Sequence, residues 1–235
     1  MGHLVIKIPE SADDCVVFND STGKMSFSIY DSETETILLS MHCITDLIKI
    51  FGLKKLKKLY LIRNEIEKIT PDSGLARLFQ LTELHLSINF ISSITGISKL
   101  VQLEVLELKR NKLVSIIDLQ SLCNLKTLNL SSNLIESMVG LSSLISLKNL
   151  DLSDNLIKIV EEINNLKLTV LDLSLNPIQN MPELDLTVMV TLLITGDSVS
   201  LQSGERMTIF YNEIAIYLRD FFTTETLIIG GQIDS

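Results

Sequence analysis

The stretch Leu125-Lys-Thr-Leu128-Asn-Leu130-Ser-Ser-Asn133-Leu-Ile135 decides the fold of this chain. Around Leu128 and Leu130, leucines alternate with polar residues, which is the period of a β-strand with one buried face. Asn133 follows where the chain must turn towards the core. Beyond it, apolar residues return at helix-like intervals, at Met138, Leu141, Leu144 and Leu147. The stretch therefore predicts a strand, an inward turn and a bulkier return segment.

The same pattern occurs six times, and an asparagine marks each copy. These residues are Asn64, Asn89, Asn111, Asn133, Asn155 and Asn176, with separations of 25, 22, 22, 22 and 21 residues. His42 and Asp197 stand at the asparagine position of two imperfect flanking copies that keep the apolar spacing. We therefore expect about eight units over residues 34–200.

One strand per unit, always running in the same direction, predicts a parallel sheet with strands about 4.8 Å apart. Because the return segments are bulkier, the stack should curve, with strands on the concave face and short helical or extended turns on the convex face. No unit can bury its leucines alone, so stacking must create the core. We expect an α/β solenoid in which the asparagine amides form a ladder between the turns, since each can donate and accept hydrogen bonds.

The pattern L-x-x-L-x-L-x-x-N-x-L identifies the chain as a member of the leucine-rich repeat class. An aliphatic residue five positions after each asparagine, as at Ile69, Ile94 and Ile116, resembles the short repeats of the protein phosphatase 1 regulatory subunit family. Axonemal dynein light-chain and U2 spliceosomal A-prime proteins have similar repeats. The resemblance covers residues 34–200 and implies a protein-binding role for the concave face.

The segments outside the repeats are predicted to cap the solenoid. Residues 1–33 should form an N-terminal cap containing a hairpin, with extended segments at 4–8, 15–18 and 25–30 and a turn at 20–23. Residues 201–235 should form a C-terminal cap. Within it, residues 211–221 are expected to form an amphipathic helix similar to the tyrosine-led cap of the families named above.

Composition excludes several classes of protein. The 235 residues are 46% hydrophobic and 21% charged, which indicates a folded chain. The net charge of −9 offers no electrostatic footprint for nucleic acid. The charge is uneven, because residues 1–112 carry 14 basic and 14 acidic residues, and residues 113–235 carry 6 and 15. No apolar run approaches the roughly 18 residues of a membrane helix, so we expect neither a nucleic-acid nor a membrane partner.

The cysteines and the N-terminal residues indicate the compartment. Cys15, Cys43 and Cys123 are odd in number and form no C-x-x-C pair, which fits a reducing environment. The first residues lack the charged and apolar regions of a secretory signal. We expect an intracellular protein, cytoplasmic and/or nuclear.

Signals for catalysis are weak. The only histidines are His3, His42 and His85, and none neighbours a serine or cysteine motif. Asp151 and Asp172 occupy equivalent places on adjacent strands, but nothing predicts the burial that a catalytic acid needs. Nucleotide-binding, zinc-binding and calcium-binding motifs do not occur. We therefore expect no enzyme activity, cofactor, metal or small-molecule substrate.

The outward-facing residues of the strands are the candidate partner-binding surface. They comprise an aromatic and cationic end (Tyr60, Ile62, Arg63, His85, Lys109 and Arg110) and an acidic end (Asn129, Asp151, Asp154 and Asp172), with Glu107 between them. Small serines accompany the acidic end and can equally be a solvated surface. A rigid platform suits a folded partner because binding orders few groups, and aromatic residues and arginine are frequent binding hot spots.

These observations favour a non-enzymatic scaffold, with a regulatory subunit of a Ser/Thr protein phosphatase as the specific form. The alternative is a cytoskeletal or axonemal component, in which a basic edge formed by Lys54, Lys55, Lys57 and Lys58 touches tubulin. A spliceosomal role is a third hypothesis and predicts residence in the nucleus. The sequence leaves the partner and the oligomeric state open.

Overall fold

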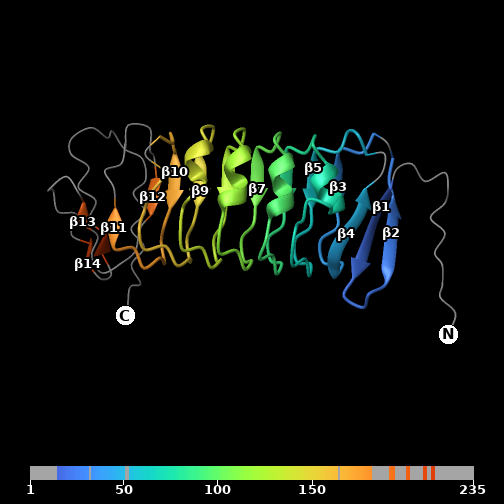
Figure 1. The fold of residues 1–235 in the computed structure, drawn as a ribbon, viewed down its shortest axis with the longest axis horizontal. Coiled ribbons are helices and arrows are strands. Elements are labelled where there is room, and N and C mark those ends of the chain that lie inside the picture. The colour runs from blue at the N-terminus through green and yellow to red at the C-terminus, as the bar shows by residue number, and fades with distance from the viewer. Residues whose placement is uncertain are drawn as a thin grey trace.

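The centre of the molecule is a parallel β-sheet of eight short strands. The structure is a computed structural model and describes residues 15–31, 33–50, 53–163, 165–181, 191–193, 200–201, 209–210 and 213–214. The strands are β3 (Thr36–Leu38), β5 (Lys58–Tyr60), β6 (Glu83–His85), β7 (Val105–Glu107), β8 (Thr127–Asn129), β9 (Asn149–Asp151), β10 (Val170–Asp172) and β12 (Thr191–Leu193). Their spatial order follows the chain, so each turn adds one strand along the long axis (Figure 1).

Short 3₁₀ helices form the return side of four turns. They are η1 (Gly74–Arg77), η2 (Thr95–Lys99), η3 (Ile117–Ser121) and η4 (Leu141–Ser143). Successive helices contact one another, and Figure 1 shows them stacked one per turn. Because these segments are too short for an α-helix, the tighter i to i+3 bonding satisfies their backbone groups. The predicted α/β solenoid with short helical turns is confirmed.

One continuous apolar core runs through the stack. The middle residue of each strand of the parallel sheet from β3 to β10 is buried, because alternate residues of a strand point to opposite faces. These residues include Leu59, Leu84, Leu106, Leu128, Leu150 and Leu171. The parallel register sets each of them beside its equivalent in the next turn. The buried cluster extends from Val16 to Ile178, so neighbouring turns complete each other's core.

An antiparallel sheet closes the N-terminal end. β1 (Cys15–Asp20) and β2 (Met25–Ile29) form a hairpin, and the Asp20 carboxylate accepts hydrogen bonds from the backbone N–H groups of Thr22 and Lys24 in its turn. The hairpin lies where the sequence predicted it, and the segment expected at 4–8 lies outside the described residues. The third strand, β4 (Ile44–Ile50), pairs with β1 although it lies inside the segment predicted as repeats. The sequence pattern did not predict β4, whose pairing depends on a distant strand.

The C-terminal part differs from the prediction. β11 (Asn180–Met181) pairs with β13 (Ser200–Leu201), and β14 (Ile209–Phe210) pairs with β15 (Glu213–Ile214). The predicted helix over 211–221 is therefore wrong at residues 213–214, where a β-branched isoleucine favours the strand. The rest of that helix, and the imperfect repeat at Asp197, lie outside the described residues.

Candidate partner-binding surface

In each strand of the parallel sheet from β3 to β10, the third residue points away from the core, and these residues form what we call the central row. In spatial order its members are Leu38, Tyr60, His85, Glu107, Asn129, Asp151 and Asp172. Each is the register partner of the next, so neighbours stand about 4.8 Å apart. The structure thus brings together six predicted site residues and adds Leu38 at the N-terminal end.

Tyr60 and His85 form an aromatic pair in this row. Their ring centroids are 4.2 Å apart and the rings are within 7° of parallel. Burial lowers the pKa of His85, while the Glu83 carboxylate, 3.7 Å from Nε2, partly opposes that shift. The uncharged imidazole is therefore favoured, and it can stack on the phenol without desolvating a charge.

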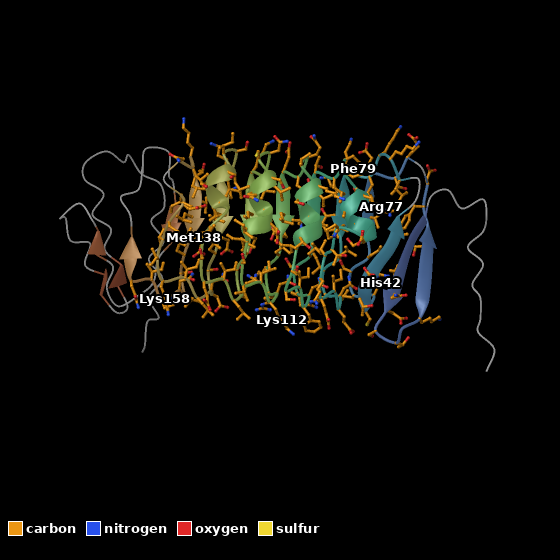
Figure 2. The ribbon with its side chains drawn as sticks, viewed as in Figure 1. His42, Arg77, Phe79, Lys112, Met138 and Lys158 are labelled. Carbon is orange, nitrogen blue, oxygen red and sulfur yellow. The ribbon has the colours of Figure 1, made fainter. Side chains whose placement is uncertain are left out.

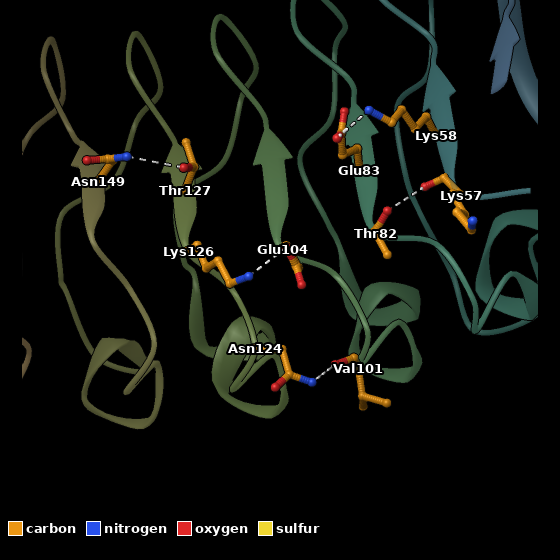
Figure 3. Close-up of polar contacts among 10 residues, drawn as sticks. All are labelled: Lys57, Lys58, Thr82, Glu83, Val101, Glu104, Asn124, Lys126, Thr127 and Asn149. Carbon is orange, nitrogen blue, oxygen red and sulfur yellow. Dashed lines mark hydrogen bonds and ion pairs between the residues drawn. The ribbon is translucent and has the colours of Figure 1, made fainter. Parts of the chain in front are cut away.

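A second outward-facing row begins two residues earlier in each strand, and we call it the leading row. It contains Lys58, Glu83, Val105, Thr127, Asn149 and Val170. The Lys58 ammonium lies 2.8 Å from the Glu83 carboxylate, which raises the pKa of Lys58 and lowers that of Glu83. Asn149 donates to the Thr127 hydroxyl (Figure 3). Sequence reasoning missed this row, although the same alternation predicts it.

At the acidic end, serines hold the carboxylates in place. One oxygen of Asp151 accepts hydrogen bonds from the backbone N–H and hydroxyl of Ser153 at 3.0 and 2.6 Å. Asp172 accepts the same pair from Ser174 at 2.9 and 2.6 Å. The second oxygen of each carboxylate has no hydrogen-bond donor among the described residues. The two acids are thus oriented alike, each with one oxygen available.

The predicted serine row is not a uniform solvated surface. Ser131 is only 1% exposed, and its hydroxyl donates to the Asn129 side chain at 2.7 Å. Asn129 therefore makes the contact that Asp151 and Asp172 make with their serines. The interpretation of the serines as a solvated surface is wrong at Ser131, because this hydroxyl positions the row beside it.

Glu107 lies in the middle of the central row and is half-buried. Burial raises the pKa of its carboxyl, the nearby negative charge of Asp151 raises it further, and Lys109 opposes both effects. Removal of this carboxylate from water costs free energy that neighbouring charges do not fully offset.

Arg63 and Arg110 lie at the rim of the sheet rather than between the leucines. They belong to a set of left-handed residues, each directly before a ladder asparagine: Arg63, Ile88, Arg110, Ser132, Asp154 and Leu175, with φ from 54° to 59°. The left-handed conformation ends the strand and turns the chain inward. In Figure 2 this rim is the lower edge of the molecule, where His42, Lys112 and Lys158 are labelled. Lys109 and Arg110 are exposed there, as is Asp154.

The six repeated asparagines are buried directly behind this rim. Asn133 is representative: Nδ2 donates to the carbonyls of Leu108 and Leu130, and Oδ1 accepts from the N–H of Leu113 at 3.0 Å. Every ladder asparagine accepts an N–H from the preceding turn, and each also donates to a carbonyl of that turn. The amides therefore satisfy buried backbone groups and hold the outward rows in register.

The basic edge that sequence reasoning considered for tubulin contact is largely neutralised. Lys57 pairs with Glu35 at 2.9 Å, Lys58 with Glu83, and Lys55 with Glu33. Figure 3 shows that such contacts join one turn to the next, as does the pair formed by Lys126 and Glu104. These lysines stabilise neighbouring turns against each other and leave little free positive charge.

The described residues contain no group of three or more histidine, cysteine, aspartate or glutamate side chains that could hold a metal ion. No helix in the described part of the chain is both long and apolar enough to cross a bilayer.

Comparison with known proteins supports the class of fold. No protein-family model matches the chain, and no curated protein sequence does. Its structure is similar to internalin InlF of Listeria monocytogenes, with a TM-score of 0.55 and 29% identity over 62% of this chain and 43% of the internalin. Internalin C2 of the same bacterium gives a TM-score of 0.55, 24% identity and coverage of 72% and 80%. The chain thus spans less than half of the InlF chain.

A plant protein has a similar structure. The leucine-rich repeat ectodomain of the Arabidopsis thaliana receptor kinase GASSHO1/SCHENGEN3 gives a TM-score of 0.54 and 24% identity over 63% of this chain and 19% of its own. That ectodomain was solved in complex with CASPARIAN STRIP INTEGRITY FACTOR 2. Together with the repeat geometry, these likenesses show a leucine-rich repeat fold. They support no specific similarity to phosphatase regulators or dynein light chains.

Proposed function

We propose that this protein is a non-enzymatic scaffold that binds a protein partner on its strand face, meaning the surface formed by the leading and central rows and the rim. The observation that carries the proposal is the central row itself. It sets an exposed apolar and aromatic end and an acidic end on one rigid sheet, held by the asparagine ladder. Binding to such a preordered surface loses little conformational entropy. The plant receptor-kinase ectodomain, solved in complex with CASPARIAN STRIP INTEGRITY FACTOR 2, supports the same use of the fold.

A test compares partner capture by two triple variants. Tyr60→Ala/Asp151→Ala/Asp172→Ala removes an aromatic and two acids from the central row. Asp72→Ala/Phe79→Ala/Asp118→Ala removes the same chemistry from the return side, where Asp72 directly precedes the N-cap of η1, Asp118 lies in η3, and Phe79 is exposed close to η1 (Figure 2). We expect the first variant to lose partners that wild type and the second variant retain, as measured by quantitative mass spectrometry of captured proteins. Identical partner sets for all three proteins would argue against the strand face.

The specific form that we propose is a regulatory subunit of a Ser/Thr protein phosphatase within the cell. The resemblance of the short repeats supports it, and the exposed thiols of Cys43 and Cys123, neither of them in a disulfide, fit a reducing compartment. Adding the protein to a purified phosphatase catalytic subunit should change its rate on a phosphoprotein substrate. An unchanged rate and no complex on gel filtration would exclude the role of phosphatase regulatory subunit. The more general scaffold function would be unaffected.

A further inference from the structure

We propose that the strand face binds a partner segment with two chemically different ends: an apolar end that lies over β3 and β5, and a Lys- or Arg-bearing end over β9 and β10. This inference rests on the proposed scaffold function and specifies the chemistry of its partner. The apolar end, the acidic end and the spacing between them support it separately.

The first support is the exposed apolar area at the N-terminal end of the face. Leu38 is 67% exposed and is the register partner of Tyr60. Met41 is 68% exposed at the rim of the same turn, and Ile62 is partly exposed in the next. Adjacent exposed apolar and aromatic side chains on a rigid sheet are typical of the anchoring part of an interface.

The second support is the distribution of counter-ions. Three carboxylates near β3 to β7 have lysines within 2.9 Å, namely Glu35 with Lys57, Glu83 with Lys58 and Glu104 with Lys126, whereas the half-buried Glu107 forms no ion pair with a described residue. Asp151, Asp154 and Asp172 form no ion pair with any described residue. The described residues therefore leave their negative charge available to the cation of a partner.

The nearby lysines indicate where the cation must lie. Lys126 and Lys148 belong to the same part of the stack, but they precede the leading row. Lys126 contacts Glu104, and Lys148 donates to the Lys167 carbonyl. The free carboxylates lie in the central row and at the rim, so the cationic end should approach from the rim side. Because both aspartates are held alike by serines, little ordering is needed when a cation binds.

The third support is the spacing. Four strand separations from β5 to β9 amount to about 19 Å. About 13 residues of helix or about six of extended chain span that distance. A single partner segment can therefore reach both ends. A second copy of this chain fits less well, since an antiparallel arrangement sets Leu38 and Met41 against Asp151 and Asp172 and buries carboxylates without a cation.

The test uses a fluorescein-labelled synthetic peptide with two leucines, a six-residue Gly-Ser spacer and three arginines, measured by fluorescence anisotropy. Two comparison peptides replace the arginines with glutamates or the leucines with serines. The acidic end is altered by Asp151→Asn/Asp172→Asn, which keeps the serine contacts because Asn129 makes them in the wild type. Asp72→Asn/Asp118→Asn removes the same number of charges from the return side, because Asp72 directly precedes the N-cap of η1 and Asp118 lies in η3.

We expect Asp151→Asn/Asp172→Asn to weaken binding of the arginine peptide about tenfold, and added salt to weaken wild-type binding more than that of this variant. The charge control should stay within about twofold of wild type. Both comparison peptides should bind more weakly than the arginine peptide. Circular dichroism verifies that each variant is folded.

Three results would overturn the inference: no measurable binding of the arginine peptide, equal binding by Asp151→Asn/Asp172→Asn, or an equal loss in the charge control. A wild-type dimer that dissociates in Leu38→Ala/Tyr60→Ala, seen by sedimentation, would assign the face to a second copy instead. If the partner-capture experiment succeeds while the peptide result fails, the scaffold function stands and only the two-ended partner is wrong. If both fail, both are wrong.

Discussion

Asn133 shows why an amide is needed once in every turn. The chain enters the core just after a left-handed residue, so carbonyls and N–H groups of two turns are buried together. Asn133 donates to carbonyls in its own turn and the preceding one, and it accepts the Leu113 N–H. An ionised aspartate could only accept, and an aliphatic side chain could do neither. The recurrence of asparagine is therefore a requirement of buried backbone chemistry.

Asn133→Ala should lower the free energy of unfolding by about 1–3 kcal/mol, because it leaves buried donors and acceptors unpaired. The matched control is Asn149→Ala, an exposed residue with one side-chain bond to Thr127. Its cost should stay within about 0.5 kcal/mol. Urea unfolding measures both, and equal costs would contradict the ladder.

Glu107 gives a prediction for pH. Burial and Asp151 raise the pKa of its carboxyl in the folded state. The protonated Glu107 therefore makes its full contribution to stability below the pKa of the unfolded state. This contribution is lost as the pH rises through the higher pKa of the folded state. The ionised carboxylate is a net destabilising group at pH 7.

Glu107→Gln should accordingly raise the melting temperature at pH 7, with a gain in stability of up to about 1 kcal/mol. The difference from wild type should shrink as the pH falls below about 4, the ordinary range for a glutamate. Glu104→Gln is the control, since it removes a carboxylate that is paired with Lys126, and it should give no gain. Thermal unfolding of both variants at pH 7 and below about pH 4 provides the comparison. A gain in stability that is independent of pH would refute the electrostatic explanation.

At the scale of elements, the 3₁₀ helices stack closely because a glycine permits one of the contacts. Gly96 lies in η2, and its N–H donates to the Ile69 carbonyl at 2.8 Å. A Cβ at this position would lie 2.2 Å from the Thr70 carbonyl oxygen. Thr70 belongs to the turn that is three residues longer than the others. The longer turn thus approaches η2 so closely that no side chain fits.

Gly96→Ala should destabilise the protein by more than about 2 kcal/mol, because backbone atoms of one of the two turns must move. Ser98→Ala, in the same 3₁₀ helix, loses only a local hydrogen bond to Thr95 and should cost within about 0.5 kcal/mol. Thermal or urea unfolding of the two variants provides the comparison. A small effect of Gly96→Ala would mean that the turns are more loosely packed than the structure indicates.

The whole molecule behaves as a one-dimensional stack, because each turn contacts mainly the turns beside it. Stability is then the sum of the turns and the interfaces between them. Leu128 lies near the middle of the stack and Leu171 near one end of the described core, and both are buried. The same substitution at the two sites should have different effects on cooperativity.

Leu128→Ala should cost about 2–5 kcal/mol and lower the urea m-value, because it weakens the link between the two halves of the stack. Leu171→Ala should lower the free energy of unfolding but leave the m-value largely unchanged, since the turns on its N-terminal side can still unfold together. Equal m-values for the two variants would contradict nearest-neighbour coupling. Hydrogen exchange can show which turns open first.

Local periodicity determined much of this protein. The alternation around Leu128, the six asparagines and the outward positions from Tyr60 to Asp172 are all readable from one turn and its repetition. They are readable because strand alternation and buried amides impose the same residues on every copy. Which of the outward residues contact a partner stays a prediction.

Only the tertiary structure decided the remaining features. The pairing of β4 with β1, the stacking of Tyr60 on His85 and the ion pair of Lys58 with Glu83 each join residues that are 20 or more positions apart in the chain. The sequence by itself settled the repeating turn, because the constraints within one turn are local and periodic. The cap, the paired charges and the free carboxylates depend on which side chains contact one another across turns. Those contacts form only when the turns are stacked.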